Sequence, residues 1–354
     1  MNQESKGQRI QFWLGILISL LCIIAILVII KPGDIWRVIR GANVFYLLLA
    51  FIGLFVFLIF RAIRWRFMLN SGMNKPGGIR YMSVFHVQNV GYLVTNILPF
   101  RLGDIARAVL IGNIPPGTVG QGLSTVLVER VLDMLFIVVL FPFTLASAVN
   151  LPGEWQTAVL AAGLLSLIAT AVFIAAANFP DVSLRITAWF CDRIPFLATE
   201  RWIKIVKNLL QGLDTLTRWK DAVILLLLSI LVWIPLILGY YIGINALDLD
   251  ATISEAAFVV CIAAFSLAAP SSPGGLGVQE AAIAFAMSGV LDFPADAAVS
   301  FALVYRALYY ILTGILGIIG ITRLGETFGS IVAATRSLIR SRSENENETA
   351  DNEV

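Results

Sequence analysis

The chain has 354 residues, of which 58% are hydrophobic and 14% charged; its net charge is +2 and its mean hydropathy +0.86. Charged residues approach a quarter of the sequence in soluble globular domains, so this composition excludes a soluble globular protein. The chain is therefore expected to be built for a lipid environment.

Six apolar stretches are each long enough to cross a hydrocarbon core roughly 30 Å thick. The first follows Lys6 and Arg9, runs long and ends without a small-residue cleavage site, which predicts a retained signal anchor rather than a cleaved signal peptide. Two shorter apolar stretches, Met82–Leu98 and Ile253–Ala269, are ambiguous. The six long stretches are Phe12–Ile30, Val44–Phe60, Leu123–Ala148, Thr157–Ala177, Ala222–Ile244 and Ala297–Ile321.

The distribution of cations predicts the orientation of the chain, because short loops rich in lysine and arginine stay in the cytoplasm. Seven cations lie between positions 181 and 221, five between 61 and 80, and four after 321. The segments 150–156 and 245–254 contain no cation and are assigned to the outside. The prediction is a multi-pass protein of the plasma (inner) membrane whose amino-terminal segment 1–11 and tail 325–354 are both cytoplasmic.

An odd number of apolar stretches, three, lies between the cytoplasmic segments 61–80 and 181–221, so one of them cannot span. Met82–Leu98 stops at a Pro-Phe-Arg-Leu-Gly-Asp sequence before the short run Ile105–Ile111, which predicts a hairpin that enters from the cytoplasm and returns there. By the same counting, Ile253–Ala269 and the run Val278–Leu291 form a hairpin that enters from outside. The predicted fold is an all-α polytopic membrane protein with about six full spans and two re-entrant hairpins.

The two hairpins share a sequence pattern. Pro99-x-x-Leu102-Gly103 recurs as Pro273-x-x-Leu276-Gly277, and an arginine follows 27 residues after the first glycine and 29 after the second. Because one copy opens inward and the other outward, units of about 82–148 and 253–321 would form an inverted repeat, an architecture that places a binding site near the membrane midplane. The alternative is a chance resemblance between two helices interrupted by proline and glycine.

The hairpin tips are candidate binding elements. Irregular backbone at membrane depth is tolerated only where protein or a water-filled cavity satisfies its polar groups. Helices that begin near the tip glycines would direct N–H groups toward an anion, and phosphate is the obvious candidate. The tip residues are Pro99, Gly103, Pro273, Gly274, Gly275 and Gly277.

Charged residues within apolar spans are costly, so each is a functional hypothesis. Arg130 and Asp133, three residues apart, share a helix face with room to pair, and Glu129 lies beside them; snorkelling toward the cytoplasm is the alternative. Arg306 lies about 14 Å into its span, next to Tyr305. Its natural partner is Glu280, just after the second tip.

Two further basic groups flank these spans. Arg61, Arg64 and Arg66 close the second span, with Trp65 expected as an interfacial anchor, and either topology or binding of lipid headgroups would explain them. In the first hairpin, Arg101, Asp104 and Arg107 would give the short helix a charged face toward the proposed cavity.

The remaining hydrophilic segments carry no catalytic pattern. Residues 180–221 read as a basic amphipathic connector at the cytoplasmic surface, although a plain linker would look similar. Residues 343–354 are acidic and expected to be disordered. Three cysteines and one histidine suggest neither a disulfide framework nor a metal site, and no cofactor is expected.

Four motifs in chain order resemble the flippase-like, lysylphosphatidylglycerol synthase transmembrane-region family over residues 12–324. The resemblance implies a membrane domain that moves aminoacylated phospholipid between leaflets, and it implies that Arg101, Asp104, Arg107, Glu129, Arg130, Asp133, Glu280 and Arg306 line a headgroup site. The soluble aminoacyl-transferase domain of the full synthase has no counterpart in this sequence. The motifs are Asn96–Arg107, Glu129–Asp133, Pro273–Glu280 and Tyr305-Arg306.

The leading hypothesis is a lipid translocase for anionic or aminoacylated phospholipid, or for another lipid with a phosphate headgroup. No GxxxxGK[ST] loop is present to power it with ATP. The alternative is a membrane enzyme, or an accessory subunit, that acts on a lipid-linked sugar or an aminoacyl lipid, with Asp104, Glu129 or Glu280 as general base. The expected partners are membrane phospholipid and, as an alternative, a separately encoded lipid-modifying enzyme. An oligomer is left open, and no nucleic acid is expected.

Overall fold

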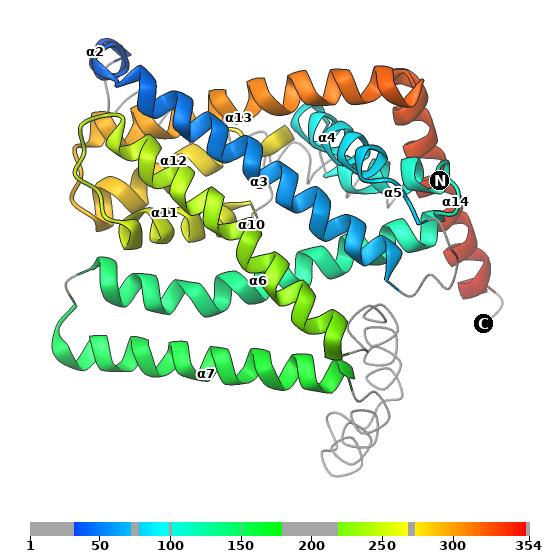
Figure 1. Cartoon of the computed structure of the whole chain (residues 1–354), viewed down its shortest axis with the longest axis horizontal. Coiled ribbons are helices and arrows are strands. Elements are labelled where there is room, and N and C mark those ends of the chain that lie inside the picture. The colour runs from blue at the N-terminus through cyan, green and yellow to red at the C-terminus, as the bar shows by residue number, and fades with distance from the viewer. Residues whose placement is uncertain are drawn as a thin grey trace.

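A computed structural model describes residues 32–71, 78–98, 101–149, 151–178, 219–267 and 273–351. Within these ranges the regular structure is entirely helical, as predicted (Figure 1). The helices are α2 (Pro32–Gly41), α3 (Val44–Asn70), α4 (Tyr81–Ile97), α5 (Leu102–Gly112), α6 (Val119–Ala148), α7 (Gly153–Asn178), α10 (Trp219–Asn245), α11 (Ile253–Ser266), η2 (Pro273–Gly275), α12 (Val278–Ala284), the π-helical η3 (Phe285–Val290), α13 (Ala295–Leu324) and α14 (Phe328–Asp351).

Five of these helices, α3, α6, α7, α10 and α13, are long and apolar enough to cross a membrane. They coincide with five of the six predicted spans, and the sixth, 12–30, lies outside the described residues. Helix α3 continues ten residues beyond the predicted end at Phe60. The expected loop that starts at Arg61 is therefore wrong at its beginning, because the arginines there belong to the helix and are paired inside the protein.

The two segments predicted to form hairpins are two short helix pairs, and their re-entrant course through the membrane stays a prediction. Helices α4 and α5 lie at one end of the long helices, and α11 and α12 lie at the other (Figure 1). The connection between α4 and α5 requires a very close approach at Gly103, because a methyl group there would meet the carbonyl oxygen of Gly91 and Oγ1 of Thr95. The tip residue Pro99 lies outside the described residues.

Helices α3 and α10 pack against each other in opposite directions. Near one end the backbone N–H of Asn43 donates to the carbonyl of Ala246 over 2.7 Å. Near the other end Ser71 Oγ donates to Asp221 Oδ2 over 2.9 Å. The pairing is thus antiparallel, and the glycines at 53 and 239 let the two backbones approach closely where the helices cross.

The contacts between helices are the same in both halves of the chain. They are preserved when α3, α4, α5 and α6 change places with α10, α11, α12 and α13, respectively. The contact of α4 with α13 then becomes the contact of α11 with α6, and both exist. The contact between α3 and α4 likewise becomes that between α10 and α11. The contact between α5 and α6 becomes that between α12 and α13, and the contact between α3 and α6 becomes that between α10 and α13.

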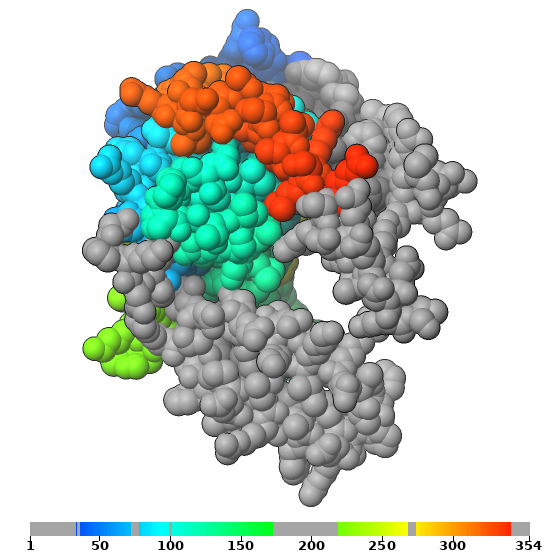
Figure 2. Space-filling view, turned by 90° about the vertical axis from the view of Figure 1, so that its right-hand side faces the viewer, coloured from blue at the N-terminus to red at the C-terminus, as the bar shows by residue number. Residues whose placement is uncertain are grey.

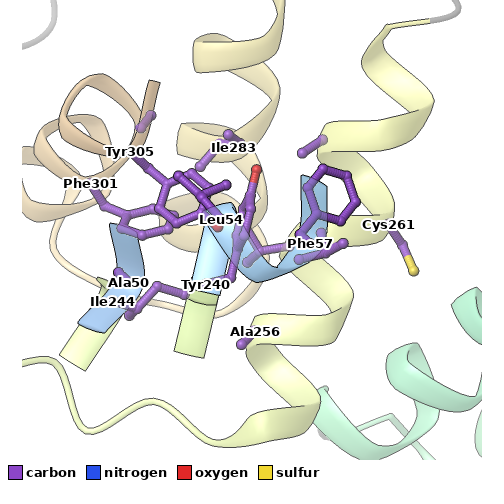
Figure 3. Close-up of a cluster of buried hydrophobic side chains, with 14 of the residues drawn as sticks. Ala50, Leu54, Phe57, Tyr240, Ile244, Ala256, Cys261, Ile283, Phe301 and Tyr305 are labelled. Carbon is purple, nitrogen blue, oxygen red and sulfur yellow. The ribbon is translucent and has the colours of Figure 1, made fainter. Parts of the chain in front are cut away.

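Two hydrophobic cores hold this arrangement. The larger core lies where α3, α10, α11, α12 and α13 meet, and Leu54, Phe57, Tyr240 and Phe301 are buried in it (Figure 3). The second core gathers residues of α4, α5 and α6 around Trp65 at the end of α3. The charged groups described below lie beside these two cores.

The carboxy-terminal helix corrects one expectation. Helix α14 runs to Asp351, through most of the segment whose acidic composition predicts disorder. Ile331 and Thr335 of α14 are buried, and the helix packs against α5 beside the end of α13 (Figure 2). The predicted amphipathic connector 180–221 lies almost wholly outside the described residues.

The outer surface of the described helices is largely apolar. Helix α7 packs mainly on α6 and exposes Leu164, Leu165, Ile168 and Val172. A monomeric soluble protein rarely exposes a contiguous apolar surface of this kind. In a bilayer the same surface faces acyl chains.

Candidate functional site

A group of buried charges joins α3, α5 and α6. Glu129 of α6 is 1% exposed and lies among three arginines: Arg61 Nε is 3.1 Å from its Oε1, Arg107 Nη2 is 2.6 Å from its Oε2, and Arg64 Nη2 is 3.7 Å from Oε1. One turn later, Asp133 accepts hydrogen bonds from Arg61 over 3.1 Å and from Arg64 over 2.7 Å. The pairing offsets the desolvation of these charges and fixes the three helices relative to one another.

Trp65 is part of this group rather than an interfacial anchor. It is fully buried, its Nε1–H donates to Thr125 Oγ1 over 3.0 Å, and the guanidinium of Arg107 lies 3.9 Å from its ring centroid. The expected membrane-surface role is therefore wrong, because α3 continues past Phe60 and carries Trp65 into the second core. Arg66, on the exposed side of the same helix, donates to the carbonyl of Ile79 over 3.0 Å.

Arg130 pairs with a different carboxylate from the one expected. Its Nη2 lies 2.8 Å from Asp104 Oδ1 and 3.0 Å from Oδ2, and its Nε lies 3.2 Å from Oδ2. The spacing of Arg130 and Asp133 allows an intrahelical pair, but Asp133 faces the arginines of α3 and Arg130 faces α5. The expected Arg130–Asp133 pair is thus replaced by two pairs between helices.

Arg101 links the two hairpin units. It precedes α5 with a left-handed backbone (φ 51°), which is unusual for a residue other than glycine, and its guanidinium donates to the carbonyl of Leu267 at the end of α11. A second link joins Asn96 of α4 to Thr313 of α13, with 3.0 Å between Nδ2 and Oγ1. The start of α5 therefore contacts the end of α11, and the end of α4 contacts the middle of α13.

A second charged group lies on α12 and α13. The predicted Glu280–Arg306 pair is present, with 3.2 Å between Oε1 and Nε. Arg306 also donates to the carbonyl of Gly274 and to Oε1 of Gln279, and its guanidinium carbon lies 4.6 Å from the ring centroid of Tyr310. The second oxygen of Glu280 accepts the N–H of Gly277 over 2.7 Å, so this carboxylate also caps α12.

The tip glycines are required by their backbone angles. Gly274, Gly275 and Gly277 have φ values of 67°, 74° and 83°, in the left-handed region that favours glycine. These turns present the carbonyl of Gly274 to Arg306 and let α12 begin beside it. Pro273 starts this turn, as predicted.

Tyr305 belongs mainly to the larger core. Its ring lies 4.2 Å from that of Tyr240 and 5.4 Å from that of Phe301, measured between centroids. Its hydroxyl is buried without a hydrogen-bond partner among the described residues. A lining role for Tyr305 in a headgroup site remains a prediction.

Gln279 escapes the sequence reasoning, whereas Tyr309 is one of the tyrosines that flank Arg306 in the sequence. Gln279 adjoins Glu280 in the sequence, but only the turn of α12 shows that it reaches Arg306. The ring of Tyr309 lies 6.4 Å from that of Tyr92, which contacts Arg61, and 6.3 Å from that of Tyr310, which contacts Arg306, measured between centroids. The spacing of three residues between Tyr309 and Arg306 was the available signal.

The site is rich in arginine. The group of charges that joins α3, α5 and α6 holds four arginines and three carboxylates, so its net charge is +1. Arg101, which directly precedes α5, raises this net charge to +2. No set of three or more histidine, cysteine or carboxylate side chains within the described residues is arranged to bind a metal ion. An excess of guanidinium groups at the meeting point of the two hairpin units suits an anion. The first group comprises Arg61, Arg64, Asp104, Arg107, Glu129, Arg130 and Asp133.

Comparison with known proteins identifies the family. A family model described as the lysylphosphatidylglycerol synthase TM region matches residues 12–317. A UPF0104 membrane protein of Methanothermobacter thermautotrophicus is 26% identical over 285 residues, which cover 75% of this chain and 81% of that protein. A UPF0104 membrane protein of Methanocaldococcus jannaschii is 24% identical over 315 residues, 86% of this chain and 92% of that protein. No solved structure is significantly similar to the chain. The chain is a multi-pass membrane protein of the lysylphosphatidylglycerol synthase TM region family.

Proposed function

We propose that the protein is a lipid translocase that moves anionic or aminoacylated phospholipid, or another lipid with a phosphate headgroup, between leaflets. The observation that carries this proposal is the net-positive arginine group where the two hairpin units meet. Guanidinium groups bind phosphate through two parallel hydrogen bonds, and charges inside a membrane span mark substrate paths. The headgroup would pass along these arginines while the acyl chains stay in lipid.

An inverted repeat would supply the movement. The exchange of the two halves preserves the helix contacts, and the equivalent helices α3 and α10 run in opposite directions. Both features are expected of two opposed units that rock about a central site and expose it to each leaflet in turn. The units 82–148 and 253–321 are the proposed moving bodies, and a hydrated cavity between them is part of the proposal.

The setting of the transporter follows from the charge distribution. We place both termini in the cytoplasm of a plasma membrane, because the cationic segments cluster on one side of the spans. A separately encoded enzyme that modifies the lipid would be a partner, and the chain would then move that enzyme's product.

Transport is favoured over catalysis by the state of the three carboxylates that could act as bases. Asp104 is held by Arg130, Glu129 by Arg61 and Arg107, and Glu280 by Arg306 and the end of α12. A carboxylate loses its ion pair when it accepts a proton, so a general base in this position would break an ion pair that holds the helices together.

Exchange of lipid between leaflets tests the proposal. The full chain is reconstituted in liposomes with headgroup-labelled phosphatidylglycerol, and an impermeant quencher measures how much label stays protected over time. We expect exchange faster than in protein-free liposomes and slowed at least about tenfold by Arg306→Gln, because one lost hydrogen bond to a charged group is worth about 1.5 to 3 kcal/mol. Arg80→Gln, on an exposed arginine just before α4, is the matched control. Equal rates with and without protein, for every anionic or aminoacylated lipid, would contradict the proposal.

A further inference from the structure

Two arginine–carboxylate pairs occupy equivalent places in the two halves. Arg130 lies on α6 and pairs with Asp104 in the first turn of α5. Arg306 lies on α13 and pairs with Glu280 in the first turn of α12. The exchange that preserves the helix contacts carries α5 and α6 onto α12 and α13, so each pair joins the corresponding two helices of its own half.

Arg130 holds Asp104 in a two-pronged arrangement. Both carboxylate oxygens of Asp104 face the guanidinium, at 2.8 and 3.0 Å from Nη2 and 3.2 Å from Nε. Carboxylate and phosphate oxygens bind guanidinium in the same two-pronged arrangement. Asp104 therefore fills the position that a lipid phosphodiester would take on Arg130, which is about one-third exposed.

Asp104 has another partner within reach. Arg107 Nη1 lies 3.7 Å from Asp104 Oδ1, and it is buried without a hydrogen-bond partner among the described residues. When a phosphate takes Arg130, a small turn of the Asp104 side chain brings it to Arg107. The exchange of partners leaves no carboxylate buried and unpaired, which would otherwise be the main obstacle.

Arg306 is held more loosely by its carboxylate. Glu280 commits one oxygen to the N–H of Gly277, and its other oxygen approaches only Nε of Arg306. This guanidinium also contacts neutral oxygens of Gly274 and Gln279 and the ring of Tyr310. A phosphate would replace neutral acceptors here, while Glu280 keeps its place on α12.

We propose that Arg130 and Arg306 are successive phosphate stations, one for each half, and that Asp104 and Glu280 are built-in counterions that compete with the lipid phosphodiester. This inference rests on the proposed function and adds the order of contacts. The ring of Tyr309 adjoins the rings of Tyr92 and Tyr310, which contact Arg61 and Arg306, and this places it on the proposed path between the stations.

Binding of labelled phosphatidylglycerol to the full chain in phosphatidylcholine nanodiscs tests the stations without requiring transport. Asp104→Asn and Glu280→Gln keep a hydrogen-bond acceptor but remove the competing charge, so each should tighten binding about tenfold. The decisive step is the cross: Arg130→Gln should cancel the gain of Asp104→Asn and leave the gain of Glu280→Gln. Arg306→Gln should do the reverse.

Three outcomes would overturn the stations. The first is that neither neutral variant tightens binding although both unfold at the wild-type midpoint. The second is that either arginine substitution cancels both gains alike, and the third is that Glu255→Gln, at a half-buried capping carboxylate of α11, tightens binding as much. Inorganic phosphate and glycerophosphate should compete poorly, because they lack acyl chains; full competition at equal concentration would assign the stations to a soluble anion instead of a lipid. If each arginine substitution cancels only the gain of its own half but no lipid moves between leaflets, the translocase is rejected and the two phosphate stations are supported. If lipid moves but this pattern is missing, the stations are rejected and the translocase is supported.

Discussion

Glu129 shows how one buried charge organises the site. It receives arginines from α3 and α5, so three helices share a single carboxylate that is 1% exposed. The sequence predicts that a charge at this depth is functional, but it does not show which helix supplies the partner. The partners are Arg61, Arg64 and Arg107, which lie between 22 and 68 positions away in the chain.

Glu129→Gln should destabilise the protein by about 3 to 5 kcal/mol, because it removes one member of a buried ion-pair group and leaves arginine charge uncompensated. Thermal unfolding in nanodiscs measures the loss. Glu154→Gln, on an exposed carboxylate at the start of α7, is the control. Equal midpoints for both variants would show that the charges around Glu129 are not coupled as described.

Two substitutions at Trp65 separate the contribution of its hydrogen bond from that of its packing. Trp65→Phe retains an aromatic face under Arg107 and loses the hydrogen bond to Thr125, so it should lower the free energy of unfolding by about 1 kcal/mol. Trp65→Ala also leaves a cavity and should cost about 3 to 5 kcal/mol. Unfolding of both variants in nanodiscs checks the order, with exposed Trp155→Phe as a neutral reference. Comparable losses for Trp65→Phe and Trp65→Ala would contradict this division.

At the scale of elements, the length of an apolar stretch predicts well that a helix forms, but it predicts poorly where the helix ends when the end is polar. Predicted and observed spans agree within a few residues wherever apolar residues stop at a turn, as at Ala148 and Ile244. The prediction fails at Arg61, because arginines ended the apolar stretch although they continue the helix and bury their charges against α6. It also fails after Ser343, where composition predicts disorder and α14 continues.

Gly103 fixes the distance between α4 and α5. Gly103→Ala would place a methyl group against the carbonyl oxygen of Gly91 and Oγ1 of Thr95, so the two helices must separate. We expect a loss of about 1 to 3 kcal/mol. Gly120→Ala, at a helical position with nothing within 4 Å of the new methyl group, should be neutral or slightly stabilising. Unfolding midpoints that fall equally in both variants would mean that propensity, not the close approach, decides.

At the scale of the molecule, hydropathy and motif spacing predicted the helical membrane class and the two short helix pairs, whose re-entrant course stays a prediction. They also predicted the Glu280–Arg306 pair, since the two residues fall near the same turn of neighbouring helices. Contacts between distant helices were out of reach, because pairs such as Asn96 and Thr313 depend on how the two halves pack and not on local pattern. The orientation in the membrane stays a prediction.

Thiol labelling tests that orientation. In a chain whose three native cysteines are replaced, Glu154→Cys lies at the start of α7, and Gly329→Cys lies at the start of α14. An impermeant maleimide should label the first in intact cells and the second only after the membrane is opened. The reversed pattern would invert the topology and leave the fold unchanged.

The central claim is that lipid moves because the two hairpin units move against each other. Asn96→Cys and Thr313→Cys, one on each unit, replace side chains that are 3.0 Å apart and should form a disulfide under oxidising conditions. Leaflet exchange of phosphatidylglycerol is then measured in liposomes before and after reduction, with each single-cysteine variant as a control. The account predicts that exchange stops on oxidation and returns on reduction in the double variant alone. Exchange at an unchanged rate in the fully cross-linked protein would contradict it.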